Sequence, residues 1–135
     1  MENISNGFGD VVDGGSERYL GQSLMELMLN LSTGSTTESV IPNIVDLIEK
    51  GADVNVRDPQ SGMSPLHIAA ALGCRPVCRA LVSCGKTNYL LRDASGRYAF
   101  ELAIEWAQDY ALGRLLIKKQ GQQAVQAGVP AWEPR

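Results

Sequence analysis

Few side chains in this sequence are suited to chemistry, and their spacing does not build a catalytic or metal site. His67 is the only histidine among the 135 residues, so any site that needs two imidazoles is excluded. Cys74, Cys78 and Cys84 lie close together in the sequence. A structural zinc site needs four ligands, however, and no Cys-x-x-Cys pair is present. We expect Cys78 to be buried and inert. Cys74 and Cys84 lie at expected helix ends, where a redox role stays open.

Glycines and carboxylates give no stronger signal. Gly7-Phe8-Gly9 lacks both a preceding strand and the Gly-Lys-Ser/Thr ending of a phosphate-binding loop. Glu101 and Glu105 lie four residues apart, which is typical of the solvated face of a helix. No spacing indicates a Ser/His/Asp arrangement or paired catalytic carboxylates. The sequence therefore predicts a protein that is not an enzyme and has no cofactor or metal.

Charge is distributed unevenly along the chain. The net charge of −3 is too mild to favour non-specific binding of nucleic acid. Residues 1–56 carry two basic and nine acidic residues, residues 57–97 carry six basic and two acidic residues, and residues 98–135 are balanced. The basic middle is either a binding surface or an ordinary solvated surface.

The cysteines and the apolar pattern favour the cytoplasm. Three cysteines, an odd number, fit a reducing compartment better than a disulfide framework. Residues 1–15 are acidic and rich in glycine, unlike a secretory signal peptide. No apolar run approaches the length that crosses a bilayer. We expect a cytoplasmic protein with no membrane partner.

The clearest local pattern is Ser64-Pro65-Leu66-His67-Ile68-Ala69-Ala70, followed after one turn by Gly73. Proline suits the first position of a helix, because its missing N–H would have no intrahelical partner there. The serine before it can cap the helix through its hydroxyl. The stretch therefore predicts a short helix that begins at Pro65, and residues 76–84 are expected to form the helix that pairs with it.

A second pattern precedes the first. Residues 42–50 place aliphatic side chains on one helical face, and Gly51 ends this helix in the manner of a C-cap. The chain continues as Gly51-Ala52-Asp53-Val54-Asn55. Together, G-A-D-V-N and S-P-L-H-I-A-A resemble the ankyrin repeat, whose first helix opens with T-P-L-H-x-A.

The resemblance continues into a more divergent unit. Thirty-four residues separate Gly51 from Gly85, one more than the usual ankyrin period. Tyr98-Ala99-Phe100-Glu101 stands in place of T-P-L-H, so the proline and the histidine are both missing. Terminal repeats are commonly atypical, because one of their faces meets water. We expect helices over residues 98–107 and 109–119.

The resemblance implies an all-α solenoid of stacked helix-turn-helix units with short hairpin loops. A leading helix is expected over residues 17–32, followed by a polar loop over residues 32–39. The expected divisions are a mobile N-terminal tail (1–16), a repeat domain (17–119) made of a degenerate first repeat (17–53), a well-preserved repeat (54–86) and a C-terminal repeat (87–119), and a C-terminal tail (120–135). Two alternatives stay open: the first tail is a docking peptide, and the second folds back over the last helix pair.

The resemblance also implies how the protein works. In ankyrin repeats the histidine of the motif, here His67, hydrogen-bonds to the backbone and orders neighbouring hairpins. Family members bind other proteins through the hairpin tips and the exposed side of each first helix. Carried over to this sequence, the candidate partner-binding residues are Arg57, Gln60, Met63, Leu72, Arg92, Arg97, Glu105 and Trp106. Arginine and tryptophan often dominate interface energies, so we expect a partner protein with an acidic and apolar surface.

Two functions are compatible with this sequence. The first is a non-catalytic, monomeric interaction module that binds through its hairpin tips and concave helix face. The second is a regulatory or chaperone-like subunit, such as an inhibitor of an enzyme or toxin, that binds through its acidic N-terminal helix. The sequence does not distinguish a partner in the same cell from a host protein met after delivery by a bacterium. Trp106 is assigned to the interface, with packing against Trp132 or the tail as the alternative.

Overall fold

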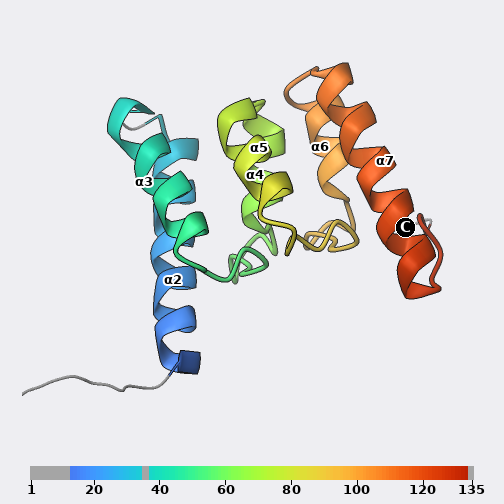
Figure 1. The fold of residues 1–135 in the computed structure, drawn as a ribbon. Helices are drawn as coiled ribbons and strands as arrows, with labels where there is room; N and C mark the ends of the chain where they lie inside the picture. The colour runs from blue at the N-terminus through green and yellow to red at the C-terminus, as the bar shows by residue number, and fades with distance from the viewer. Residues whose placement is uncertain (1–12, 35–36, 134–135) are drawn as a thin grey trace, which may run out of the picture.

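The computed structural model describes residues 13–34 and 37–133. Within these residues the chain forms helices and no strand. In chain order the helices are α2 (Asp13–Ser32), α3 (Thr37–Glu49), α4 (Pro65–Leu72), α5 (Arg75–Ser83), α6 (Ala99–Glu105) and α7 (Tyr110–Ala127) (Figure 1). The all-α prediction is confirmed for this part of the chain.

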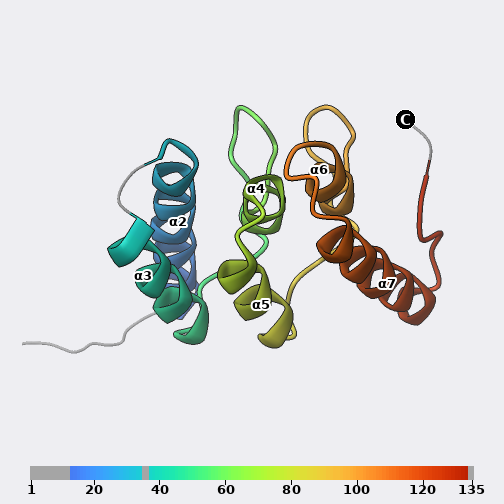
Figure 2. The same ribbon diagram turned by 90° about the horizontal axis from the view of Figure 1, so that it is seen from above.

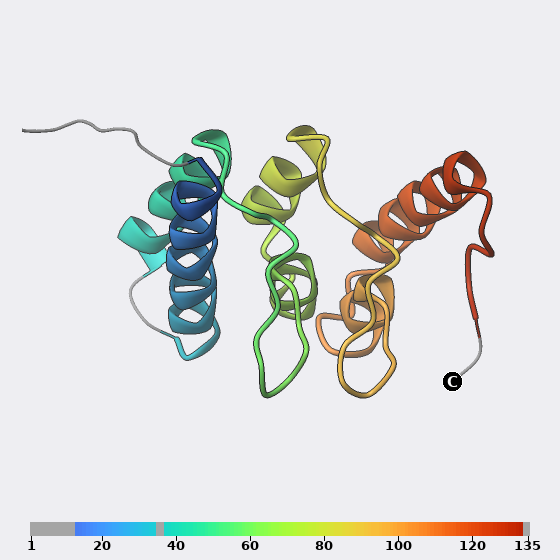
Figure 3. The ribbon, with the colours of Figure 1, turned by 90° about the horizontal axis from the view of Figure 1, so that it is seen from below.

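The helices form three antiparallel pairs that stack side by side. α2 packs on α3, α4 on α5 and α6 on α7, and neighbouring pairs contact each other through α2, α4 and α6 and through α3 and α5. Figure 2 shows α2, α4 and α6 in one row, here called the inner row, and α3, α5 and α7 in a second row, the outer row. The outer row fans out more widely than the inner row (Figure 3), so the inner row lies on the concave side of the stack.

One aliphatic core runs between the two rows. Side chains from all six helices are completely or almost completely buried in it: Leu24, Met28, Ile44, Leu66, Val77, Leu81, Leu102 and Leu116. Burying one such side chain stabilises the fold by about 1.5–3 kcal/mol. Because these residues come from every pair, no single pair has a complete core of its own, and the stack must fold as a unit.

Helix α4 begins and ends where its sequence predicts. The Ser64 hydroxyl accepts a hydrogen bond from the backbone N–H of His67, and Pro65 occupies the first turn. Gly73 closes the helix with a φ of 65°, a left-handed conformation that glycine adopts readily. In α6 no proline is present, and the Glu101 carboxylate instead accepts a hydrogen bond from the N–H of Tyr98 at 2.9 Å. Both inner helices are therefore fixed at their first turn.

The hairpins before α4 and α6 stack directly on each other. The N–H of Ala94 donates to the carbonyl of Ser61 at 2.8 Å. Gly62 has a φ of +71°, and a Cβ at this position would lie only 2.7 Å from the Ala94 nitrogen. Glycine is therefore required at position 62, both by the backbone conformation and by the approach of the next hairpin.

The N-terminal pair differs from the sequence prediction in two places. α2 begins at Asp13, so residues 13–16 are helical and do not belong to a tail, whereas residues 1–12 of the predicted tail lie outside the described residues. α3 begins at Thr37, so the expected polar loop is shorter and Pro42 lies inside the helix. Proline normally breaks a helix because it removes one hydrogen bond. Here the helix continues on both sides of it, since Val40 and Ile44 are both buried in the core.

The C-terminal helix is longer than predicted. α7 continues to Ala127, so residues 120–127 are helical rather than a tail. Its buried positions recur every four residues, at Leu112, Leu116, Gln120 and Ala124, which keeps one face on the array through Ala124. Gly128, with a φ of 71°, then ends the helix.

Residues 128–133, here called the C-terminal strap, return toward the hairpin before α6. The Gln120 side-chain amide donates to the carbonyl of Ala131. The N–H of Glu133 donates to the Tyr98 hydroxyl at 3.1 Å. The structure therefore shows this segment folded back, which is one of the two alternatives for it. Trp132 itself stays 57% exposed.

Candidate functional site

The only histidine is committed to structure. Its Nδ1 accepts a hydrogen bond from the N–H of Ser64 at 3.2 Å, so the proton lies on Nε2, which donates to the carbonyl of Arg97 at 3.0 Å. His67 is almost fully buried, and burial lowers the pKa of the imidazole. A neutral ring thus links the start of α4 to the hairpin of the next unit. The structural role expected for His67 is confirmed.

The cysteines are separate, free thiols. Cys78 is buried, and burial raises the pKa of its thiol to about 12. Because the thiolate is the reactive form, Cys78 is inert at neutral pH, as predicted. Cys74 and Cys84 are half-buried. Within the described residues, no cluster of three or more His, Cys, Asp or Glu side chains is placed to hold a metal ion.

The strongest candidate for recognition lies at the C-terminal ends of α4 and α6. Trp106, directly after α6, is 56% exposed, and the Arg97 guanidinium lies 4.9 Å from the centre of its ring. Arg97 is held in this position by Asp93, whose carboxylate accepts from Arg97 Nε at 3.0 Å and from the Arg97 N–H at 2.8 Å. A cation held over an aromatic face is a favourable arrangement. It presents an apolar surface and a positive charge side by side.

Leu72 extends this surface onto the neighbouring helix. It occupies the last position of α4 and is 43% exposed. A Cβ at Gly73 would lie 3.2 Å from the Cβ of Ala107, so the ends of α4 and α6 that carry Leu72 and Trp106 are close. We call Leu72, Arg97 and Trp106 the inner patch. Glu105 is exposed beside Trp106 in the chain.

The remaining sequence candidates divide into framework and exposed residues. Arg57 is exposed, but its guanidinium donates to the carbonyl of Gly62 at 3.1 Å and to the carbonyl of Arg92. Arg92 lies 4.9 Å from the centre of the Tyr98 ring and donates to the backbone of the strap. Both arginines therefore brace the hairpins. Gln60 is exposed at the hairpin before α4, and Met63 is half-buried against the core.

One link between repeats is not predicted from the sequence. Arg75 Nε and Nη2 donate to the two carboxylate oxygens of Asp109 at 2.9 and 2.7 Å. Asp109 also accepts from the N–H of Leu112 and so caps α7. The hydrogen bonds from Arg75 lower the pKa of this carboxyl. The two residues are thirty-four positions apart, which equals the repeat period given by the glycines. Opposite charges at this spacing could have predicted the ion pair.

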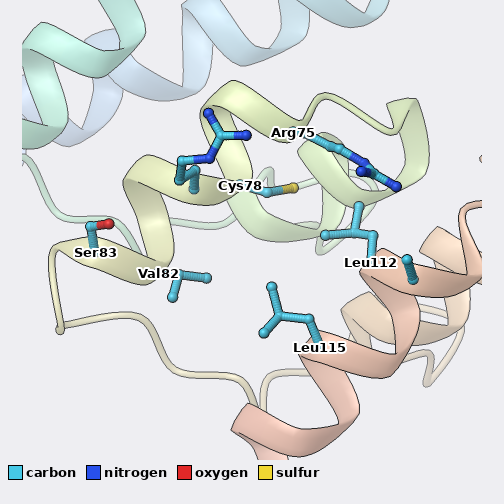
Figure 4. Close-up of a pocket in the computed structure, with 8 residues that line it drawn as sticks. Arg75, Cys78, Val82, Ser83, Leu112 and Leu115 are labelled. Carbon is cyan, nitrogen blue, oxygen red and sulfur yellow. The ribbon is translucent and has the colours of Figure 1, made fainter.

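A groove on the outer row is likewise not predicted from the sequence. It lies between α5 and α7 and has a volume of about 240 Å³ (Figure 4). Its lining residues are Arg75, Cys78, Arg79, Val82, Ser83, Ala111, Leu112 and Leu115. The groove combines side chains from helices that are distant in sequence, so no local motif indicates it.

Comparisons with known proteins agree with this architecture. The sequence model of a family described as ankyrin repeats, in three copies, matches residues 37–127. This range covers α3 to α7. Among curated proteins, none matches the chain significantly. None of the described helices is long and apolar enough to cross a membrane. Ankyrin repeats are generally modules for protein–protein interaction and are typically not catalytic. The predicted resemblance is confirmed, and the chain belongs to the ankyrin repeat family.

Proposed function

We propose that this protein is a non-catalytic, monomeric interaction module that binds a partner protein with its concave side. The observation that carries this proposal is the inner patch, where Trp106 is more than half exposed under the Arg97 guanidinium and the exposed Leu72 ends the neighbouring helix. Tryptophan and arginine are enriched among the residues that contribute most to binding energy at interfaces. The hairpin tips, with Gln60, and the exposed Glu105 would supply the polar rim.

The chemistry of the inner patch favours a partner with an apolar and acidic surface. Leu72 and Trp106 offer apolar area that remains in contact with water in the free protein, and its burial would drive association. Arg97 carries a positive charge that Asp93 balances on one side only. A carboxylate of the partner would approach the guanidinium from the opposite side. Arg57 and Arg92 would contribute positive potential at the hairpins while keeping their internal bonds.

A reducing compartment suits the proposed module. All three cysteines are free, although Cys74 and Cys84 are partly accessible. Accessible thiols persist where glutathione keeps them reduced. We therefore assign the protein to the cytoplasm of the cell in which it acts.

Affinity capture from the native source, with tagged Trp106→Ala and Trp132→Ala variants, tests the proposal. The two tryptophans are a matched pair, because they are 56% and 57% exposed. We expect Trp106→Ala to capture at least ten-fold less partner than the wild type, and Trp132→Ala to capture as much. The wild type and both variants should have the same helical signal and melting temperature. Equal capture by both variants would contradict the proposal.

The alternative, a regulatory or chaperone-like subunit, would use α2 instead. This helix has 20 residues, compared with 8 in α4, and Figure 1 shows it extending beyond the other helices of its row. Tyr19 on this helix is 68% exposed. Deleting residues 1–32 would not test this alternative cleanly, since Leu24 and Met28 belong to the core. Tyr19→Ser combined with Glu26→Lys changes only exposed positions, and loss of capture in this variant alone would favour the alternative.

A further inference from the structure

The outer row contains an apolar groove that the concave-side function does not use. α7 leans away from α5 toward its C-terminal end (Figures 1 and 2). Between the two helices, Val82 faces Leu115 across an open space, with Cys78 and Leu112 nearer the closed end (Figure 4). Leu115 is 41% exposed. An apolar side chain is thus left in water on the convex side.

The groove is fixed by contacts at its edges. Arg75 and Asp109 tie the first turns of α5 and α7 together through two hydrogen bonds. On the other side, α7 is drawn onto α6 at Gly113, where a Cβ would lie only 2.5 Å from Cγ1 of Ile104. α7 therefore cannot move toward α5 without losing its packing on α6. The open space is a consequence of how the last repeat is packed.

The charge around the groove is positive. Arg79 lines it, and among the described residues Arg79 makes no ion pair. Lys118 follows Leu115 by one helical turn on α7 and is exposed. The carboxylate of Asp109, directly before α7, is already bound by Arg75. The neighbouring groove between α3 and α5 contains both Glu49 and Lys86, so its lining has no excess of positive charge.

The size of the groove limits its occupant. A volume of about 240 Å³ lies below the range of roughly 300–1,000 Å³ that is typical of small-molecule sites. It suits anchoring side chains that project from a larger surface. An apolar lining with a positive rim requires apolar anchors next to negative charge.

We propose that this groove is a second docking site, which binds an acidic, amphipathic helix of a partner protein. Two apolar side chains one helical turn apart enter between Val82 and Leu115, and carboxylates beside them pair with Arg79 and Lys118. The site lies on the opposite row from the inner patch, so the protein can hold two partners at once and bridge them. This inference does not depend on the proposed concave-side function.

A fluorescein-labelled peptide helix of leucine, glutamate and alanine, with leucines four residues apart, is a suitable probe. Its binding to the full chain is followed by fluorescence polarisation. We expect Leu115→Ser and Arg79→Glu each to weaken binding at least ten-fold. Both positions are exposed, so the fold should survive, and circular dichroism checks this. Val125→Ser, at a position that is 81% exposed on the same helix, and Trp106→Ala should bind as the wild type does. A peptide with lysine in place of glutamate should bind at least ten-fold more weakly.

Four results would overturn the proposal. The first is absence of binding, or binding that Leu115→Ser and Arg79→Glu leave unchanged. The second is loss of binding in Trp106→Ala, which would place the probe on the inner patch. The third is self-association that Leu115→Ser abolishes in sedimentation, which would make a second copy the occupant. The fourth is tighter binding after deletion of residues 1–12, which would make that segment of the chain the occupant.

Discussion

Single residues connect the repeats, and His67 does so most directly. Its imidazole accepts a hydrogen bond from the backbone N–H of Ser64 at Nδ1 and donates one to the backbone carbonyl of Arg97 from Nε2. Arg97 is in turn the residue whose side chain braces Trp106. A hydrogen bond made for stability therefore also positions the hairpin that carries the inner patch.

His67→Ala should lower the free energy of unfolding and remove part of its pH dependence. The variant removes the hydrogen bond from Nε2 to the Arg97 carbonyl, which still accepts from the Asp93 N–H at 2.9 Å. A hydrogen bond of this kind typically contributes about 0.5–1.5 kcal/mol. Burial lowers the folded-state pKa of His67 below 6.5. The stability due to the neutral ring is therefore complete above pH 6.5 and is lost as the pH falls toward the folded-state pKa, because the unfolded chain then binds the proton.

Urea unfolding at pH 7.5 and pH 5.5 measures this effect. The wild type should lose more stability than His67→Ala between the two pH values. Thr87→Val is the control: it removes a buried hydrogen bond to the carbonyl of Leu81, which should cost about 1 kcal/mol, but it keeps the pH dependence, since the imidazole and its partners remain. Equal pH dependence in the wild type and His67→Ala would mean that folding leaves the pKa of the imidazole unchanged.

At the level of elements, α7 contains two glycines with different surroundings. Gly113 meets Ile104 of α6 closely, whereas a Cβ at Gly121 would meet nothing within 4 Å. Alanine favours a helix over glycine by about 1 kcal/mol at both positions. The two positions therefore separate the effect of helix propensity from that of packing.

Gly121→Ala should stabilise the protein by about 0.5–1 kcal/mol. Gly113→Ala should destabilise it instead, because overpacking a core typically costs about 1–3 kcal/mol. Adding Ile104→Ala should relieve the clash, so the double variant should be more stable than the sum of the single effects predicts. Chemical unfolding of the four proteins gives this double-mutant cycle. Additive effects would mean that α7 does not depend on this contact.

The elements also show which parts of the fold the sequence could predict. The start of α4 was predictable because its cap, its proline and its closing glycine are all local. The length of α7 was not, because Gln120 and Gly121 read as the start of a tail. The helix is extended by the burial of Gln120 and Ala124 and by the hydrogen bond from Gln120 to the strap. The burial and the hydrogen bond both depend on tertiary structure. Trp106 was predictable as an exposed residue from the repeat pattern, but its contact with Arg97 required coordinates.

The whole molecule is a stack of three helix pairs, and the last pair is covered at its C-terminal end by the strap. At the C-terminal end, the strap satisfies Tyr98 and Gln120, which are both buried. Deleting residues 128–135 should remove these hydrogen bonds, at about 1 kcal/mol each. We expect the free energy of unfolding, measured by urea titration, to fall by about 1–3 kcal/mol. Tyr98→Phe should account for one part of this loss, and an unchanged stability after truncation would show that the strap is only loosely attached.

The central claim is that the concave side recognises another protein. Photo-cross-linking in the native source tests it most directly, with a photo-reactive residue placed singly at Leu72, Glu26 or Val125, all of which are exposed. We predict that one partner protein is cross-linked from position 72, and that Trp106→Ala abolishes this product. Cross-linking from position 26 or 125 with none from position 72 would contradict the account.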